Sequence, residues 1–447
     1  MTLLDILPSL RAAMTPRLDP ALWPATTHVD ERGRITVGGV ALADVADHFG
    51  TPAYVLDESD VRHRCRTYRD TFPEAEIAYA AKALLTRAVA RWVTEEGLSL
   101  DVCSAGELET ALSAGADPRR IILHGNAKTS ADLSAARAAG VGRIVVDSHT
   151  EITLLAASGR GRQNVLVRVT PDVGVRTHRA LTTGVHDQKF GFPISGGHAE
   201  DALRRVLGQP RLNLIGLHCH LGSQITDPAP FATAIDRLVG TMAQVRHDHG
   251  TILTQLNIGG GHGISYTTGD PALDPSTLAA TVEDALDDAC ARHRFPRPRV
   301  TLEPGRAIVG RAGVTVYRVL SVKRIEGART FVCVDGGMSD NPRVARYGAR
   351  YGVAVANRHS TAPATVVTVA GRHCEAGDEL AVDVSLPADL RPGDVLAVPV
   401  TGAYHHSMAS SYNAVPRPPV VAVAHGVPRE LVRRETVTDL LRRDVGA

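Results

Sequence analysis

A lysine and a pair of histidines are the first residues in this chain whose types and spacing could perform chemistry. Lys82 ends an apolar stretch, and a lysine that is partly removed from water can lose its proton and react as a Schiff-base amine. His218 and His220 lie two residues apart, so in a strand both rings face the same side. Such a pair suits a metal ion or a flat cofactor, and two buried structural histidines are the alternative.

Two further groups could bind an anion. The triple glycine at positions 259–261 can expose backbone N–H groups to a phosphate, although a simple flexible turn has the same composition. Glu303 and Arg306 belong to the sequence Glu-Pro-Gly-Arg. The carboxylate could pair with a protonated ring nitrogen, and the guanidinium could bind a phosphate or a carboxylate. A surface ion pair is the alternative for these two residues.

All four groups lie at the ends of short apolar runs that alternate with helical stretches. The eight runs are residues 76–82, 98–104, 120–126, 143–148, 164–170, 214–220, 255–261 and 300–306. Helical patterns at 84–97, 106–115 and 130–140 each end in glycine, a common residue at helix C-termini. Eight β/α units predict a parallel (β/α)₈ barrel of the TIM type, whose active sites lie at the C-terminal ends of the strands. A doubly wound open sheet is the structural alternative.

The strand ends of the predicted barrel carry polar, titratable or glycine residues, and we expect them to form one site. They are Lys82, Asp101, Ser104, His124, Asn126, Asp147, Arg168, His218, His220, Gly259, Gly260, Gly261, Glu303 and Arg306. After residue 308 strands follow one another with little helix between them. We therefore expect a (β/α)₈ barrel over 49–308 and a C-terminal β-rich barrel or sandwich over 309–447, completed by the N-terminal segment 1–48.

Composition excludes several classes of protein. The 49 Lys and Arg residues against 48 Asp and Glu give a net charge of +1, so no affinity for nucleic acid is expected. No uncharged apolar run is long enough to span a membrane. The N-terminus has an early Asp5 and Pro8 and no basic segment, so we expect no signal peptide. Six cysteines without a CxxC pair indicate a reducing compartment, and we expect a cytoplasmic protein.

The motifs at these strand ends resemble those of one known family. They are YAAKAL (79–84), LDVCSAGEL (100–108), HGNAK (124–128), DQKFGF (187–192), LHCHLGSQI (217–225), NIGGG (257–261), LEPGRAIV (302–309), DGGMSDNPR (335–343), GRHCEAGD (371–378) and GAYHHSMASSYN (402–413). In this order they resemble the fold-type III pyridoxal-phosphate decarboxylases, and most closely the diaminopimelate decarboxylases of lysine biosynthesis. The resemblance covers nearly the whole chain.

The resemblance implies a role for each of a set of residues. Lys82 would hold pyridoxal 5′-phosphate as a Schiff base, and the other cofactor-binding residues would be His220, Ser223, Gly259, Gly260, Gly261, Glu303, Gly305, Arg306 and Tyr404. Substrate would contact Arg306, Arg343, Tyr347, Glu375 and Tyr404. Cys374 would donate a proton, with Lys82 and His220 as the other catalytic residues. In the family Cys374 and Glu375 reach the partner subunit's site, which implies a homodimer with shared sites.

The implied reaction is that of a carboxy-lyase acting on an amino acid. It would decarboxylate meso-2,6-diaminopimelate at its D-centre to L-lysine and CO₂, the last step of lysine biosynthesis. Decarboxylation leaves a carbanion, for which the cofactor is an electron sink. A carboxylate such as Glu303 at the ring nitrogen keeps that nitrogen protonated, which favours this chemistry. Three other side chains, Asp101, Glu107 and Arg168, would support Lys82.

Two positions depart from the family pattern next to residues that would touch substrate. Ala376 replaces a serine in the expected Cys-Glu-Ser-Gly-Asp, and Arg346 replaces a leucine in the expected Pro-Ala-Leu-Tyr-Gly. A decarboxylase for another D-amino acid or an amino-acid conjugate is therefore the first alternative. A metal-dependent barrel hydrolase using His218 and His220 is the second, and a non-catalytic binding homologue is the third.

Overall fold

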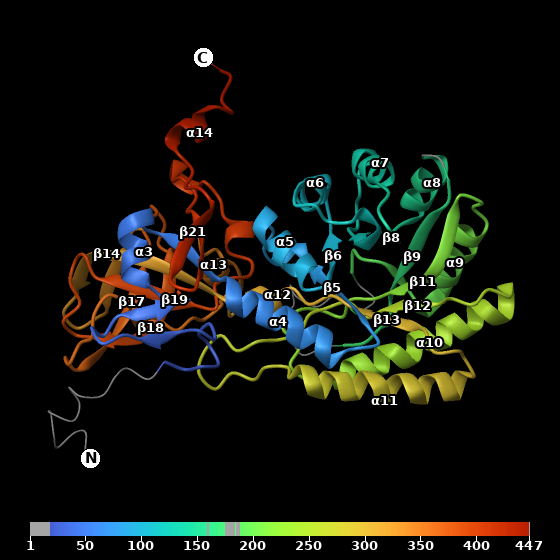
Figure 1. Ribbon diagram of the computed structural model, residues 1–447, viewed down its shortest axis with the longest axis horizontal. Coiled ribbons are helices and arrows are strands. Elements are labelled where there is room, and N and C mark those ends of the chain that lie inside the picture. Colours follow the sequence, from blue (N-terminus) through green and yellow to red (C-terminus); the bar gives the residue numbers. More distant parts are fainter. Residues whose placement is uncertain (1–17, 159–160, 175–183, 185–187, 447) are drawn as a thin grey trace. The chain divides into compact units, whose positions relative to one another are not determined.

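The computed structural model describes residues 18–158, 161–174, 184 and 188–446 (Figure 1). Two predicted features lie partly outside this range: residues 1–17 of the N-terminal segment, and Asp187 of the DQKFGF motif. The chain divides into two compact units. The β unit comprises residues 1–61, 265–270 and 309–447, and the barrel unit comprises residues 62–264 and 271–308.

The barrel unit is built around eight parallel strands, as the sequence predicts. In spatial order they are β9 (Gln163–Thr170), β11 (Leu212–His218), β12 (Gln255–Asn257), β13 (Arg299–Leu302), β5 (Glu76–Ala80), β6 (Ser99–Val102), β7 (Ile121–Leu123) and β8 (Arg143–Val146). Pairing of β8 with β9 closes the barrel. The short strand β10 (Phe192–Pro193) adds to β9 in parallel. The open doubly wound sheet is therefore wrong, because an open sheet would leave β8 and β9 as unpaired edges.

Helices surround the barrel, and their starts are specified by side chains just beyond the strands. They are α4 (Glu58–Thr71), α5 (Arg87–Glu95), α6 (Ala105–Ser113), α7 (Ser130–Ala139), α8 (His149–Ala157), α9 (His198–Leu207), α10 (Ala229–His249), α11 (Pro275–His293) and α12 (Arg306–Val309). Thr86, Ser104, Thr129 and Ser148 each accept a hydrogen bond from the backbone N–H three residues further on. These caps satisfy N–H groups that a helix start otherwise leaves without partners.

The inside of the barrel combines an apolar layer with a buried polar network. Ala78, Ile122, Val145 and Leu166 pack together across the interior. At the opposite end from Lys82, Glu76 on β5 forms two bonds with Arg143 on β8, of 2.5 and 2.6 Å. Ser99 Oγ donates to Glu76 over 2.6 Å, and Arg143 donates to Gln255 Oε1 over 3.2 Å. This network joins β5, β6, β8 and β12 through side chains.

The β unit contains two sheets. One is a meander of β1 (His28–Val29), β2 (Ile35–Val37) and β3 (Val40–Ala41). The larger sheet contains β4 (Ala53–Asp57), β14 (Gly313–Arg324), β15 (Thr330–Val334), β16 (Ala354–Val355), β17 (Ala364–Ala370), β18 (Glu379–Pro387), β19 (Val395–Pro399), β20 (Val420–Ala424) and β21 (Val427–Val432). Short helices α3 (Leu42–Phe49), α13 (Arg343–Tyr347) and α14 (Val437–Leu441) accompany them.

One boundary differs from the sequence expectation. Residues 53–57 fall inside the predicted barrel range of 49–308, yet they form strand β4 of the β unit. This strand pairs antiparallel with β14 and parallel with β20, so its backbone hydrogen bonds belong to that sheet. A single apolar strand has no sequence mark that distinguishes the two sheets. Residues 265–270 also cluster with the β unit.

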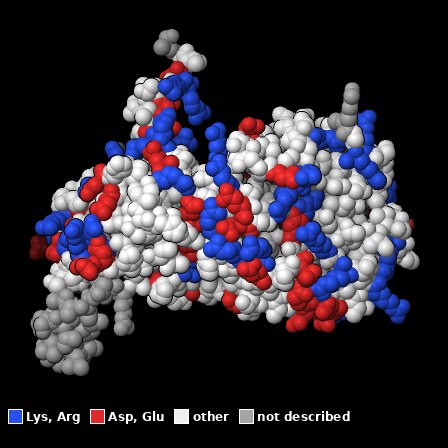
Figure 2. All heavy atoms as spheres, in the orientation of Figure 1, with Lys and Arg blue, Asp and Glu red and all other residues white. Residues whose placement is uncertain are grey.

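The exposed faces carry charges of both signs. Figure 2 shows Lys and Arg side chains interspersed with Asp and Glu on the face in view. Among the described helices, none combines the length and the apolar character that crossing a membrane requires.

The buried Glu76–Arg143 pair generates a stability prediction. We expect Arg143→Ala to lower the free energy of unfolding by about 3 to 5 kcal/mol, because it leaves the Glu76 carboxylate buried without its partner. Arg329→Ala, which removes an exposed partner of Glu379, should cost under about 1 kcal/mol. Urea titration measures both, and a loss below about 1 kcal/mol in Arg143→Ala would contradict the prediction.

Candidate functional site

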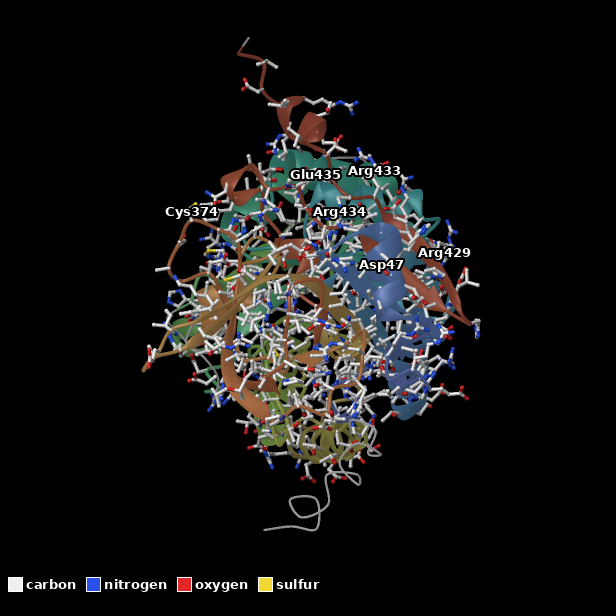
Figure 3. The ribbon with its side chains drawn as sticks, turned by 90° about the vertical axis from the view of Figure 1, so that its left-hand side faces the viewer. Asp47, Cys374, Arg429, Arg433, Arg434 and Glu435 are labelled. Atoms are coloured by element: carbon white, nitrogen blue, oxygen red, sulfur yellow. The ribbon has the colours of Figure 1, made fainter. Side chains whose placement is uncertain are left out.

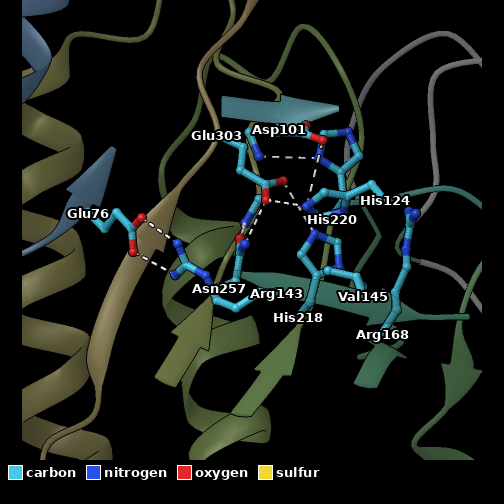
Figure 4. A network of polar contacts seen from close by, with 12 residues as sticks. Glu76, Asp101, His124, Arg143, Val145, Arg168, His218, His220, Asn257 and Glu303 are labelled. Carbon is cyan, nitrogen blue, oxygen red and sulfur yellow. Dashed lines mark hydrogen bonds and ion pairs between the residues drawn. The ribbon is translucent and has the colours of Figure 1, made fainter. Parts of the chain in front are cut away.

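The carboxylate of Glu303, just after β13, is the centre of a buried polar cluster (Figure 4). Asn257 Nδ2 donates a hydrogen bond to its Oε1 over 2.6 Å. His124 Nε2 lies 2.8 Å from the same oxygen, and His218 Nε2 lies 3.3 Å from Oε2. The three partners follow or end strands β7, β11 and β12, so the barrel itself brings them together. A buried charge is tolerated only when it is paired in this way.

The partners of Glu303 determine its ionisation. Burial favours its neutral form, but His124 and His218 oppose this and lower the pKa of Glu303 well below its usual value. Burial lowers the pKa of His218 to about 3, so its ring is neutral and its Nε2–H faces the carboxylate. Glu303 is thus a carboxylate at neutral pH, and it can accept a hydrogen bond from a protonated ring nitrogen.

Lys82, His220 and Asp101 lie near one another at the same end of the barrel. Lys82 belongs to a short 3₁₀ helix, Ala81–Ala83, that directly follows β5. Burial raises the pKa of Asp101 to about 6, while His124 and, more weakly, Lys82 act in the opposite direction. Burial, assisted by Lys82, lowers the pKa of His220 well below its usual value. The Gly260 N–H donates to His220 Nδ1 over 3.2 Å, which fixes the ring's orientation.

The glycine run forms a cradle that only glycine can form. A Cβ at Gly260 would collide with the carbonyl oxygen of Glu303, and one at Gly261 with that of Gly222. Gly261 also has a φ of +97°, a conformation that other residues rarely adopt. Arg306 Nη2 donates to Ser223 Oγ over 2.9 Å. The N–H groups of Gly259 and Gly260 are used within the protein, by Asn257 Oδ1 and His220 Nδ1. The absence of side chains at the glycine run and the guanidinium of Arg306 beside it suit a phosphate, so the residues present fit a phosphate-bearing ring next to Glu303.

Two other residues that the sequence places around Lys82 hold neighbouring loops. Arg168 lies 3.7 Å from the carboxylate of Asp147, and its guanidinium lies over the ring of Phe190 at 4.3 Å. Glu107 Oε2 accepts a hydrogen bond from the Cys103 N–H over 2.7 Å. Both contacts tie the loops that follow the barrel strands.

In the β unit, tyrosines surround the guanidinium of Arg343. Tyr266, Tyr347 and Tyr404 present their rings at 5.3, 5.6 and 5.9 Å from it. Arg343 Nε donates to the hydroxyl of Tyr351 over 2.9 Å. Burial by itself disfavours the charged form, but the tyrosines outweigh it and raise the pKa of Arg343. The arginine is therefore a fixed, permanently charged group that suits a carboxylate.

The substituted residue Arg346 lies beside this arginine cluster. Its side chain is exposed, and its guanidinium lies 5.6 Å from the ring centre of Tyr347. Arg346 therefore adds a second positive charge next to a residue that the family resemblance assigns to substrate binding.

Cys374 and Glu375 are on a different loop of the β unit. Asp378 holds this loop by accepting hydrogen bonds from the His373 N–H over 2.7 Å and the Met338 N–H over 2.6 Å. Tyr412 donates its hydroxyl hydrogen to Glu375 over 2.9 Å. Cys374 itself is exposed, and Figure 3 shows it at the outer edge of the view. A thiol and a carboxylate are thus presented outward on a loop with fixed ends.

Sequence reasoning missed several of these residues. His124 was expected in the site as a strand-end residue but received no role. Asn257 was missed, although it is a polar residue at the end of an apolar strand, which is the signal that could have singled it out. Tyr266 and Tyr351 were also missed, and no local pattern marks them, because they lie 77 and 8 residues from Arg343 and meet it only in the fold.

The alternative of a metal site on His218 and His220 does not match the geometry. Among the described residues, the group whose ligand atoms converge is His124, His218 and Glu303, and His220 is not part of it. In this group His124 Nε2 and His218 Nε2 lie 2.8 and 3.3 Å from the carboxylate oxygens of Glu303. His220 instead accepts the hydrogen bond from Gly260.

Comparison with known proteins agrees with this geometry. The family described as "Pyridoxal-dependent decarboxylase, pyridoxal binding domain" matches residues 58–310. The diaminopimelate decarboxylase of Actinosynnema pretiosum subsp. auranticum is 56% identical over 446 residues, covering 100% of both chains. That of Mycobacterium tuberculosis (strain ATCC 25618 / H37Rv) is 46% identical over 440 residues, covering 96% of this chain and 98% of the relative.

A solved structure extends the similarity to the fold. Diaminopimelate decarboxylase from M. jannaschii, in co-complex with L-lysine, superposes with a TM-score of 0.89 at 30% identity, covering 95% of this chain and 99% of the other. The similarity thus includes the barrel and the β unit. The chain therefore belongs to the diaminopimelate decarboxylase family of pyridoxal-dependent decarboxylases.

Proposed function

We propose that the protein decarboxylates meso-2,6-diaminopimelate at its D-centre, giving L-lysine and CO₂ as the last step of lysine biosynthesis. The observation that carries the proposal is the ionised Glu303 beside the glycine cradle. Pyridoxal phosphate, when bound, supplies an electron sink for the carbanion that loss of CO₂ leaves. A carboxylate at the ring nitrogen strengthens that sink. The identity to diaminopimelate decarboxylases along the full chain supports the choice of substrate.

The residues of the barrel unit would hold the cofactor. Its aldehyde would bind the amine of Lys82, and its ring would lie against His220. Its phosphate would lie at the glycine run 259–261, with Gly305, Arg306, Ser223 and Tyr404 as further contacts. Because His220 is neutral and fixed by Gly260, it can face a ring without placing a second positive charge beside Lys82.

The substrate would be held by charge and hydrogen bonds. We assign its carboxylates to Arg306 and to Arg343, with Tyr347 and Tyr404 as additional donors. Glu375 would meet the distal ammonium group of the substrate, an opposite charge. Cys374 would return a proton to the carbon that has lost CO₂, since a thiol within reach can act as a general acid. Tyr412 is already bonded to Glu375 and would orient that carboxylate.

We further propose a cytoplasmic homodimer whose sites are shared between subunits. The exposed position of Cys374 and Glu375 supports sharing, because both are presented outward by a loop whose base is fixed by Asp378. All six cysteines are free, which agrees with a reducing compartment.

A second candidate is a related decarboxylase for another D-amino acid or an amino-acid conjugate. Two observations favour it: Ala376 lacks the hydroxyl of the family's serine, and Arg346 adds an exposed positive charge beside Tyr347. A site that has lost a hydrogen-bonding group to substrate can change its preference by tenfold or more (roughly 1.4 kcal/mol).

The substrate assignment predicts lysine formation. The purified protein loaded with pyridoxal phosphate should form lysine from meso-diaminopimelate, and Lys82→Ala should reduce the rate by roughly a thousandfold or more, because the amine that binds the cofactor is lost. Amino-acid analysis measures the product. D-lysine, D-ornithine and D-arginine form the comparison panel. Faster turnover of one of these than of meso-diaminopimelate would favour the second candidate.

The shared site predicts complementation between two inactive variants. Lys82→Ala and Cys374→Ala should each be inactive alone. Mixed under conditions that exchange subunits, they should regain about one quarter of the wild-type activity, because half of the dimers are mixed and each has one intact site. A mixture that stays inactive while mass spectrometry detects mixed dimers would contradict sharing.

The titration of Asp101 predicts a pH effect. Because burial raises its pKa to about 6, the side chain is an anion above pH 6 and is neutral below it. We expect kcat/KM to fall as the pH drops through 6, since the attraction between this anion and Lys82 disappears. Asp101→Asn should lose about tenfold in kcat/KM at pH 8 and lack this step in its pH profile. An unchanged profile in Asp101→Asn would assign the step to another group.

A further inference from the structure

The end of the barrel opposite Lys82 contains a separate cavity of about 760 Å³. Six strands begin with a residue that lines it: Glu76, Ser99, Arg143, Gln163, Gln255 and Arg299. Lys82 lies beyond the other end of β5, six residues from Glu76 along the chain. At about 3.3 Å per residue the two ends are roughly 20 Å apart, so this cavity is distinct from the cofactor site.

Positive charge dominates the lining of this cavity. Its arginines are Arg119, Arg120, Arg137, Arg143, Arg162 and Arg299, and Glu76 is the one carboxylate among its lining residues. The Glu76 carboxylate accepts two hydrogen bonds from Arg143 and a third from Ser99, so its charge is already paired. Arg119 is paired with Asp117, which is not part of the lining, over 2.8 Å. For Arg120, Arg162 and Arg299, Glu76 is the only carboxylate among the lining residues.

Three of these arginines are oriented by neutral groups. Arg120 Nη2 donates to Gly97 O over 2.5 Å, Arg137 Nη2 to Gly161 O over 2.9 Å, and Arg162 Nε to Leu212 O over 3.1 Å. A backbone carbonyl fixes a guanidinium but does not cancel its charge. Each such bond uses one of the five N–H groups of an arginine.

The crowding of positive charge has an electrostatic signature. Burial and the neighbouring Arg211 both lower the pKa of Arg137, which means that its charged form is under repulsion. An anion in the cavity would relieve this repulsion. Planar guanidinium groups match the oxygens of phosphates and carboxylates in paired hydrogen bonds.

We propose that this cavity binds a small, multiply charged oxyanion such as a di- or triphosphate group. A singly charged anion would match only one of the surplus arginines. The cavity volume falls within the range of small-molecule sites, about 300–1,000 Å³. The alternative is that the arginines serve only to bond backbone carbonyls at or just before the starts of barrel strands, in which case no saturable binding occurs.

Binding is tested on the protein loaded with pyridoxal phosphate and freed of excess cofactor. Isothermal titration in a buffer without phosphate uses four probes: tripolyphosphate, pyrophosphate, ATP and citrate. We expect saturable binding of at least one probe, at one site per chain, that weakens with added NaCl because salt screens the charges. The ranking among the probes distinguishes a phosphate, a nucleotide and a polycarboxylate as the source.

Two double variants that lose the same positive charge distinguish binding in the cavity from a general effect of the protein's charge. Arg137→Gln with Arg299→Gln should weaken binding at least tenfold. Arg292→Gln with Arg297→Gln, which changes exposed arginines on the same unit that pair with acidic residues, should change it less than twofold. Equal weakening in both double variants, or no saturable binding by the wild type, would overturn the proposal.

A measurement on the wild type covers the case in which the variants fold poorly. Phenylglyoxal modifies accessible arginines, and peptide mass spectrometry locates the modified sites. The bound probe should protect Arg137 and Arg299 and leave Arg292 and Arg297 reactive. Protection of Arg306 instead, or loss of the cofactor's visible absorbance on titration, would place the anion in the cofactor site and refute a separate one.

Discussion

The buried carboxylate of Glu303 is the constraint on which the barrel's functional end depends. An ionised group inside a protein needs several polar partners, and Glu303 obtains them from Asn257, His124 and His218, which come from three different strands. Closure of the barrel is what makes this possible, because it brings β7, β11, β12 and β13 around one point. The glycine cradle follows from the same closeness, since Gly260 must pass directly against the backbone of Glu303.

Much of the fold could be predicted from the sequence, and the reason is local. Each barrel strand is a short apolar run with a polar residue at its end, and helices α5, α6 and α7 are each introduced by a serine or threonine cap and ended near a glycine. Such signals need no knowledge of distant contacts. Strand β4 was placed in the wrong unit because its partners, β14 and β20, lie hundreds of residues further along the chain.

The site followed the same division. Lys82, the glycine run and the Glu-Pro-Gly-Arg motif could be found because each stands at the end of an apolar run. The resemblance to a family implied their roles. The separate roles of His218 and His220 were harder to predict, because two residues on the same face of a strand can have different partners. His218 contacts Glu303, whereas His220 accepts a hydrogen bond from Gly260. Around Arg343, Tyr347 and Tyr404 were expected from the resemblance. Tyr266 could not be foreseen, since it joins them from a segment that is enclosed in sequence by barrel residues.

The surroundings of Arg343 have a consequence for the energetics of recognition. A free arginine side chain samples many rotamers, and immobilising it on binding costs conformational entropy, about 0.5–1.5 kcal/mol for such a side chain. Three aromatic rings and the hydroxyl of Tyr351 already restrict this one. The Arg343 side chain therefore loses this conformational entropy when the β unit folds. A carboxylate that reaches it binds a preorganised guanidinium. Discrimination there rests on the shape and charge of the incoming molecule, with little contribution from adjustment of the protein.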